Sequence, residues 1–242
     1  MTGSDGRDSA GAAVDLNADL GEEVTDDAGL LAIVTSANVA CGYHAGSPAI
    51  MRAVCAEAAV RGVAVGAQVS YADRPNFGRV ALDVAYDVLR EQIADQVGTL
   101  AEIAASEGVR VSYVKPHGAL YHRTMDDAEQ ARAVLDGSVI DGRGLPVLGM
   151  DGELLARARE AGREVWHEGF PDRGYGEEGR LVPRGEPGAL VESEDGIVAQ
   201  ALELAGRVDS LCLHGDSPGA VAHAAAVRRE LEAAGWWLRP LG

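Results

Sequence analysis

Short apolar runs alternate with longer amphipathic runs along nearly all of this 242-residue chain. The apolar runs predict strands at Ala13–Asn17, Val34–Ala40, Val63–Ala67, Val109–Val114, Pro146–Met150, Glu164–His167 and Ser210–His214. The amphipathic runs predict helices at Pro48–Arg61, Val84–Glu107, Asp127–Leu135, Glu153–Ala161, Asp195–Gly206 and Pro218–Ala234. Strands that alternate with helices form βαβ units, because two parallel strands need a crossover connection. The chain is therefore predicted to be an α/β protein with a parallel sheet.

Length alone allows one α/β barrel or two small domains. Neither a linker nor a repeat interrupts the alternation, so one domain is expected over residues 12–242. Residues 1–11 are rich in Gly, Ser and Asp and are expected to form a disordered tail. Gly174–Arg184 holds several glycines and a proline, which predicts a hairpin or irregular segment over the barrel.

The net charge of −17 argues against nucleic acid as a partner, because phosphate binding needs a basic face. No apolar run reaches the roughly 18 residues of a membrane-spanning helix, and Met1–Gly11 lacks the apolar core of a signal peptide. Cys41, Cys55 and Cys212 show no CxxC spacing, which fits a reducing compartment. A cytoplasmic protein that binds a small molecule is expected.

Polar residues collect where the predicted strands end. The clusters are Asp15–Asp19, Asn38–His44, Gln68–Tyr71, Lys115–His117, Asp172–Arg173 and His214–Asp216. Four of the six histidines lie in or beside them, namely His44, His117, His122 and His214. In parallel α/β folds the carboxyl ends of the strands carry the chemistry, because the following loops converge there. The clusters therefore predict one active site.

Lys115 is the only lysine of the chain, whereas the other 20 permanently positive side chains are arginines. A lysine ammonium is a compact point charge that can also lose its proton, while the arginine guanidinium is a planar fork that stays charged. Pro116 stiffens the next turn, and His117 can titrate or bind a metal. These neighbours favour a lysine in a functional site over a surface lysine without a function on a solvated loop.

Several clusters allow more than one chemistry. Asp15, Asn17 and Asp19 share one face if their segment is extended, where carboxylates either bind a cation or divide acid and base roles. Asp19 is also a suitable cap for a loop. His44 is suited to act as a base or a ligand. The chain has neither a GxxxxGK[ST] nor a GxGxxG motif, so it has no recognised means of holding ATP itself.

Six segments together resemble the LamB/YcsF family of 5-oxoprolinase A subunits. They are Asp15–Glu22, Thr35–Gly46, Gly66–Arg79, Val114–Tyr121, Phe170–Arg184 and Cys212–Asp216. The resemblance implies a deformed seven-stranded (β/α) barrel of the glycoside hydrolase/deacetylase superfamily. It also implies ATP-dependent opening of 5-oxoproline to glutamate. Allophanate-hydrolase-like partner subunits would then hold most of the ATP site, and a homo-oligomer is compatible with this.

On this basis we assign catalytic roles to Asp19, His44, Lys115 and His117. Lys115 would stabilise a developing oxyanion or phosphate, and Asp19 or His117 would activate water. Arg173 would hold the substrate carboxylate. Further substrate contacts are expected from Asp15, Asn17, Asn38, Gln68 and His214.

Two positions at the expected mouth of the barrel depart from the family's usual pattern. Gln68 replaces a histidine of the typical Gly-Ala-His-Pro-Ser segment, and Ser47 replaces an aspartate. Glutamine cannot serve as a base and is a poor transition-metal ligand, so no metal is expected. Two alternatives stay open: a diverged enzyme acting on another lactam, amide or imine in specialised metabolism, and a non-catalytic binding subunit.

Overall fold

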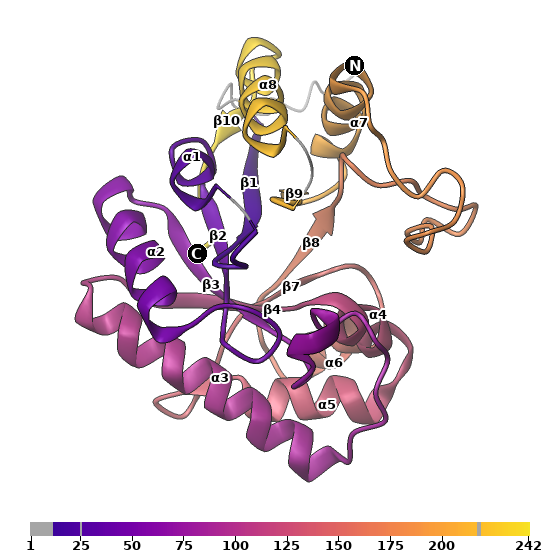
Figure 1. Cartoon of the computed structure of the whole chain (residues 1–242). Coiled ribbons are helices and arrows are strands. Elements are labelled where there is room, and N and C mark those ends of the chain that lie inside the picture. The colour runs from indigo at the N-terminus through magenta and orange to yellow at the C-terminus, as the bar shows by residue number, and fades with distance from the viewer. Residues whose placement is uncertain (1–11, 25, 217–218) are drawn as a thin grey trace, which may run out of the picture.

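Seven parallel strands close into a barrel in the computed structural model of the chain, which describes residues 12–24, 26–216 and 219–242. The strands are β1 (Ala13–Leu20), β2 (Ser36–Ala40), β3 (Ala64–Val69), β4 (Val111–Pro116), β7 (Val147–Gly149), β8 (Val165–Gly169) and β9 (Ser210–Leu213). Each strand pairs with the next, and β9 pairs with β1 and closes the ring. A short strand, β10 (Trp237–Leu238), also pairs with β1. The predicted seven-stranded barrel is confirmed (Figure 1).

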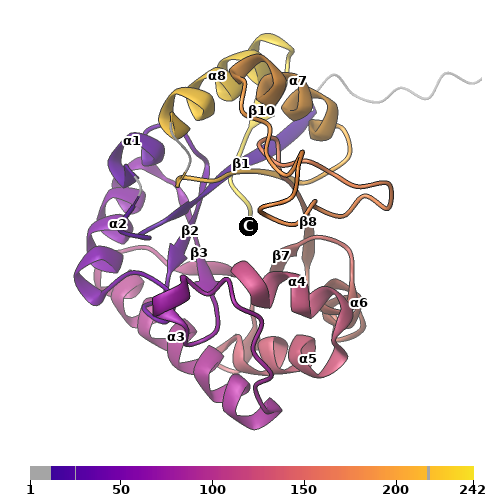
Figure 2. The same ribbon diagram turned by 45° about the vertical axis from the view of Figure 1, so that its right-hand side comes forward.

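Helices surround this barrel (Figure 2). They are α1 (Asp27–Leu31), α2 (Pro48–Arg61), α3 (Tyr86–Ser106), α4 (Gly118–Asp126), α5 (Ala128–Gly137), α6 (Glu153–Glu160), α7 (Glu194–Ala205) and α8 (Ala220–Ala233). A 3-10 turn (Arg74–Asn76) precedes α3, and a small hairpin of β5 (Val139–Ile140) and β6 (Arg143–Gly144) precedes β7. Six helices confirm the predicted ones, while α1 and α4 were not predicted. Within the described ranges, no helix combines the length and apolar character needed to cross a membrane.

The start of α2 shows how local sequence sets a helix boundary. Ser47 Oγ accepts a hydrogen bond from the backbone N–H of Ile50, and Pro48 occupies the first helical position. Gly62 ends the helix with a φ of 69°, which glycine adopts without steric cost. The matching start predicted at Pro218 lies outside the described residues, as does the predicted tail at residues 1–11.

The barrel has an apolar outer surface and a polar interior. Val14, Leu16, Ala18 and Leu20 of β1 belong to the main apolar core, which also holds residues of the surrounding helices. The alternate residues of β1 point into the barrel, where they contact β2, β4, β8 and β9. Barrels of this kind usually fill their interior with branched apolar side chains. Here the interior combines a hydrogen-bonded polar network with a small apolar cluster of Tyr113, Leu148, Trp166 and Leu241.

This polar interior explains why four strands end later than predicted. β1 continues to Leu20, β3 to Val69, β4 to Pro116 and β8 to Gly169, two or more residues past the predicted ends. Polar residues at these ends resemble loop residues in the sequence. In the barrel they continue the strands, because partners on other strands satisfy their side chains.

Asp15 makes this interior sensitive to pH. Its carboxylate accepts hydrogen bonds from Thr35 and Ser36, both at 2.6 Å, and from Ser210. Burial raises the pKa of Asp15 to about 6, although these hydroxyl groups oppose the rise. The folded protein therefore holds a proton that the unfolded chain has released above about pH 4.

We expect Asp15→Asn to remove part of the pH dependence of stability. As pH rises from about 4 to about 6, ionisation of Asp15 lowers the unfolding free energy of the wild type by on the order of 3 kcal/mol. The variant lacks this loss, so its stability relative to the wild type should increase over that range and then level off. Urea unfolding of both proteins at several pH values measures this difference. A constant difference would contradict the expectation.

The segment Gly174–Arg184 lies between β8 and α7 and has no regular helix or strand (Figures 1 and 2). Isolated antiparallel bridges join Tyr175 to Leu181 and Arg173 to Leu190. Arg173 donates from Nε to Ala189 O at 3.0 Å and from Nη2 to Val182 O at 2.8 Å. The predicted irregular hairpin is confirmed, and Arg173 anchors it from within.

Candidate active site

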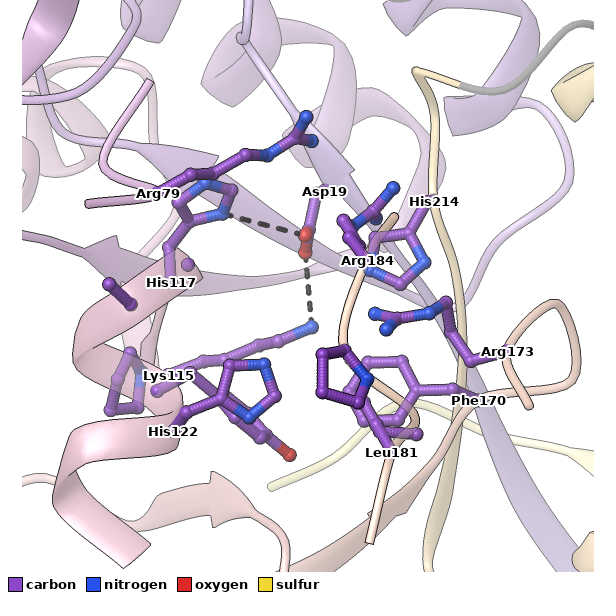
Figure 3. A pocket seen from close by; sticks show the side chains of 15 residues that line it. Asp19, Arg79, Lys115, His117, His122, Phe170, Arg173, Leu181, Arg184 and His214 are labelled. Atoms are coloured by element: carbon purple, nitrogen blue, oxygen red, sulfur yellow. Dashed lines mark hydrogen bonds and ion pairs between the residues drawn. The ribbon is translucent and has the colours of Figure 1, made fainter. Parts of the chain in front are cut away.

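A cavity of about 350 Å³ lies at the carboxyl ends of the barrel strands. Basic side chains dominate its lining: Asp19, Arg79, Lys115, Pro116, His117, Gly118, Ala119, Tyr121, His122, Phe170, Arg173, Leu181, Pro183, Arg184 and His214. Figure 3 shows these side chains around one space, with Lys115 and Asp19 facing each other. Asp19 supplies the one carboxylate among the described residues of this lining. The cavity is therefore suited to an anionic ligand.

Lys115 is buried at the end of β4, with 2% of its surface exposed. Its Nζ lies 3.0 Å from Asp19 Oδ1 and 2.7 Å from Glu168 Oε1. It also donates to Cys212 Sγ at 3.2 Å and lies 5.5 Å from the ring centre of Phe170. Burial alone would lower the pKa of Lys115, but Asp19, Cys212 and Glu168 raise it well above its ordinary value. The ammonium group is thus a fixed positive charge in a buried position at the cavity wall.

Asp19 is held in one orientation by its neighbours. Its Oδ1 accepts from Asn38 Nδ2 at 2.9 Å as well as from Lys115. Asn38 in turn donates to Asn17 Oδ1 and accepts from the Tyr113 hydroxyl, both at 2.6 Å. Although burial acts to raise it, the Lys115 charge holds the pKa of Asp19 well below its usual value. Asp19 is therefore an ionised carboxylate at neutral pH.

A sharp turn places His117 at the cavity wall. Pro116 ends β4, and Gly118 begins α4 with a φ of 61°. A Cβ atom at Gly118 would lie 2.4 Å from the backbone oxygen of Gly78, so only glycine fits there. The conformation of Pro116-His117-Gly118 thus explains why a proline and a glycine flank the histidine.

His117 belongs to a buried cluster with Glu22, His44 and Gln68. Gln68 Nε2 lies 2.9 Å from His117 Nδ1 and donates to Glu22 Oε1 at 2.9 Å. His117 Nε2 lies 3.2 Å from the backbone oxygen of Phe77. In this arrangement Nδ1 accepts a hydrogen bond and Nε2 carries the proton, and burial lowers the pKa of His117.

His44 lies behind His117, and their rings stack with centres 4.1 Å apart. Its Nε2 lies 3.9 Å from Glu22 Oε1. Burial lowers the pKa of His44 well below its usual value. Burial, aided by the charge of Asp19, raises the pKa of Glu22 to about 8. This cluster therefore groups a carboxyl group and two neutral imidazoles in a buried site whose one cavity-lining member is His117.

His214 lies on the opposite side of the cavity. Its Nδ1 is 2.9 Å from Asp172 Oδ2, and its backbone N–H donates to the same oxygen at 3.0 Å. Its ring stacks on Phe170, with centres 5.5 Å apart. Burial acts to raise the pKa of Asp172, but His214 holds it below the ordinary value. A carboxylate thus orients the imidazole through Nδ1, which leaves Nε2 for a ligand.

The structure brings five of the predicted site residues to the cavity: Asp19, Lys115, His117, Arg173 and His214. The other five, Asp15, Asn17, Asn38, His44 and Gln68, are buried outside its lining. Gln68 and Ser47 were expected at the mouth of the barrel, and this placement is wrong. Gln68 is fully buried behind His117, and Ser47 caps α2. Neither departure from the family pattern therefore lies in the cavity lining, although Gln68 contacts His117, which does.

Sequence reasoning missed several residues of the site. Glu168 pairs with Lys115 and accepts from the Tyr121 hydroxyl at 3.0 Å. It lies one residue past the predicted strand Glu164–His167, so a longer strand would have placed it beside the site. Glu22 and Asp172 lie in segments that resemble the family, but no role was predicted for them. Their partners, Gln68 and His214, are more than 40 residues away in the sequence.

A sequence profile of the LamB/YcsF family matches residues 14–242 of this chain. Proteins named as the A subunit of 5-oxoprolinase from two organisms are close relatives. The protein from Streptomyces avermitilis is 54% identical over 92% of this chain and 97% of that protein. The protein from Mycobacterium avium is 48% identical over 94% of this chain and 98% of that protein.

Solved structures agree with this relationship. The lactam utilization protein from Thermus thermophilus is 34% identical and superposes with a TM-score of 0.88 over 95% of this chain and all of that one. The catalytic domain of a peptidoglycan N-acetylglucosamine deacetylase from Eubacterium rectale shares the fold at 13% identity, with a TM-score of 0.52 over 99% of this chain and 93% of that one. The chain belongs to the LamB/YcsF family.

Proposed function

We propose that this chain is the ring-opening subunit of an ATP-dependent 5-oxoprolinase. The observation that supports this most directly is the buried Lys115–Asp19 pair in a cavity lined by Arg79, Arg173 and Arg184. 5-Oxoproline is a small lactam with one carboxylate. Its carbonyl needs a positive charge where the oxyanion develops, and its carboxylate needs a cationic partner. The cavity offers both.

Lys115 would stabilise negative charge on the lactam oxygen or on a phosphate attached to it. A charge fixed in a dry site is effective, because it does not have to reorient during the reaction. Phosphorylation of the lactam oxygen would make the ring carbon more electrophilic. The chain has no recognised nucleotide motif, so we assign the ATP site mainly to allophanate-hydrolase-like partner subunits.

Asp19 is better placed than His117 to activate water. Both ring nitrogens of His117 have partners, namely Gln68 and the backbone oxygen of Phe77. Asp19 Oδ2 is bound by neither Lys115 nor Asn38, which both contact Oδ1, and it lies 3.8 Å from His117 Nδ1, which is longer than a hydrogen bond (Figure 3). A water molecule would add to the ring carbon and pass its proton to this carboxylate.

His214 would act as the acid for the leaving nitrogen. When the C–N bond breaks, its electron pair moves to the ring nitrogen, which then takes a proton from His214. The phosphate on the former lactam oxygen would leave as inorganic phosphate when a second water hydrolyses the resulting acyl phosphate, which gives glutamate. The substrate carboxylate would contact Arg173 or Arg184. Arg173 already donates from Nε and Nη2 to backbone carbonyls, so Nη1 and the second N–H of Nη2 are its available donors.

We expect His214→Gln to lower kcat by about a hundredfold or more, since general acid catalysis contributes about that factor. Asp172→Asn should lower kcat less and leave KM nearly unchanged, because it disturbs only the orientation of the imidazole. Steady-state kinetics of the assembled enzyme measure both effects. A change confined to KM would assign His214 to binding.

Release of glutamate from 5-oxoproline is the test of the proposed function. The assay is run with ATP, with and without the partner subunits from the same organism. We expect release only when the partners and ATP are both present. No release under either condition, from folded protein, would overturn the proposal and favour a different lactam, amide or imine as substrate.

A further inference from the structure

We propose that Glu22, His44 and His117 bind a divalent first-row transition cation. One ligand atom from each side chain lies within 4.8 Å of the others, and all three residues are buried. Two imidazole nitrogens with one carboxylate oxygen suit zinc and its neighbours better than magnesium or calcium, which prefer oxygen ligands. This inference concerns binding and does not depend on the proposed ring-opening activity.

The first support is that His44 is buried without a hydrogen bond to any residue that the structure describes. Neither of its ring nitrogens has a hydrogen bond within the described part of the chain, although the residue is only 1% exposed. Buried polar atoms are nearly always hydrogen-bonded, because leaving one unpaired costs free energy. Gln68 Oε1 is also buried without a hydrogen bond to any described residue. A cation beside Glu22 would accept the lone pair of His44 Nε2, the ring nitrogen that faces Glu22 Oε1.

The second support is the geometry of the other two ligands. Glu22 Oε1 lies 3.4 Å from His117 Nδ1, close to the roughly 3.4 Å that separates two ligands of a tetrahedral zinc ion. The 3.9 Å between Glu22 Oε1 and His44 Nε2 needs to shorten slightly. His117 Nε2 donates to the Phe77 carbonyl, which leaves the Nδ1 lone pair directed at the cluster. Metal-binding histidines are commonly held in this way.

Gln68 occupies the centre of this cluster. Its amide N–H group donates to Glu22 and lies against His117 Nδ1, where positive charge is favoured. Rotation of the Gln68 amide by half a turn would place Oε1 between Glu22 and His117, where Nε2 now lies, and would make it a fourth ligand. The sequence predicted no metal because Gln68 stands where the family has a histidine. The structure supplies three ligands without it.

The test is titration of the full chain with zinc chloride after removal of metal by a chelator, followed by calorimetry. We expect one zinc ion per chain and a higher melting temperature with zinc. His44→Gln and Glu22→Gln should each weaken binding at least about tenfold. His122→Gln is the matched control, because His122 lines the cavity but lies outside the cluster, and it should bind zinc as the wild type does.

Gln68→His provides an opposite test, since it adds an imidazole ligand and should tighten binding about tenfold or more. Cobalt should give a visible absorption band with the wild type and lose it with Glu22→Gln. If the wild type fails to bind zinc while Gln68→His binds it, this chain has lost the site and the proposal is wrong. Zinc binding that persists in both the His44 and Glu22 variants would also overturn it.

Discussion

Lys115→Met is expected to abolish ring opening in the assembled enzyme, with a loss in kcat of about a thousandfold. The physical reason is that Lys115 supplies the fixed positive charge beside the carbonyl oxygen, and loss of such a charge in a dry site costs several kcal/mol in the transition state. Methionine keeps the length and the apolar stem of the side chain but removes the charge. Glutamate release with saturating ATP and partners measures the effect.

The same substitution will also destabilise the fold. It leaves Asp19 and Glu168 buried without the ammonium group that both contact. Breaking a buried ion pair typically costs about 3–5 kcal/mol. Stability and activity must therefore be separated.

Lys115→Met combined with Glu168→Gln provides this separation. The second change removes one of the two unpaired carboxylates, so the double variant should recover part of the lost stability. It should not recover activity, because the charge at the carbonyl is still missing. Activity that returns together with stability would show that Lys115 has a structural role only.

Asp19→Asn is expected to lower kcat by about a hundred- to a thousandfold. Asparagine keeps the shape and accepts the hydrogen bond of Asn38, but it cannot take a proton from water. Lys115 keeps Glu168 as its partner, so it should stay charged in this variant. The measurement is kcat of the purified variant with its partners, and KM should change little.

Asp15→Asn is the matched control for this experiment. It is the same substitution on the same strand and the same face, but Asp15 lies outside the cavity lining. It should retain nearly full activity. An equal loss in both variants would show that activity depends on the interior polar network as a whole and would contradict the assignment of Asp19.

The alternation of strands and helices was enough to predict the barrel. Each of the seven predicted strands overlaps a strand of the barrel, and the six predicted helices are all present. Helix α4 was missed because its start at Gly118 follows a histidine that makes no side-chain cap. Its buried face, which includes Leu120 and Tyr121, depends on contacts with the barrel rather than on a local signal.

The clustering of polar residues at strand ends predicted where the site lies. It did not predict which of these residues line the cavity and which lie deeper in the barrel. The sequence places Asp15, Asn17 and Asp19 on one face without showing which of them reaches the cavity. The depth of each residue in the barrel decides this, because Asp15 and Asn17 lie deeper than Asp19. Asp15 accepts a hydrogen bond from Ser36, and Asn17 donates to Ser210 and Glu168.

The sequence by itself determined the fold class, the end of the barrel that carries the chemistry and the importance of Lys115. These follow from short-range periodicity and from residue types that one strand and its loop contain. Only the tertiary structure decided that Glu168 shares Lys115 with Asp19, and that Gln68 lies behind His117 instead of in the cavity. Such contacts join residues far apart in the chain, and closure of the barrel sets their distances.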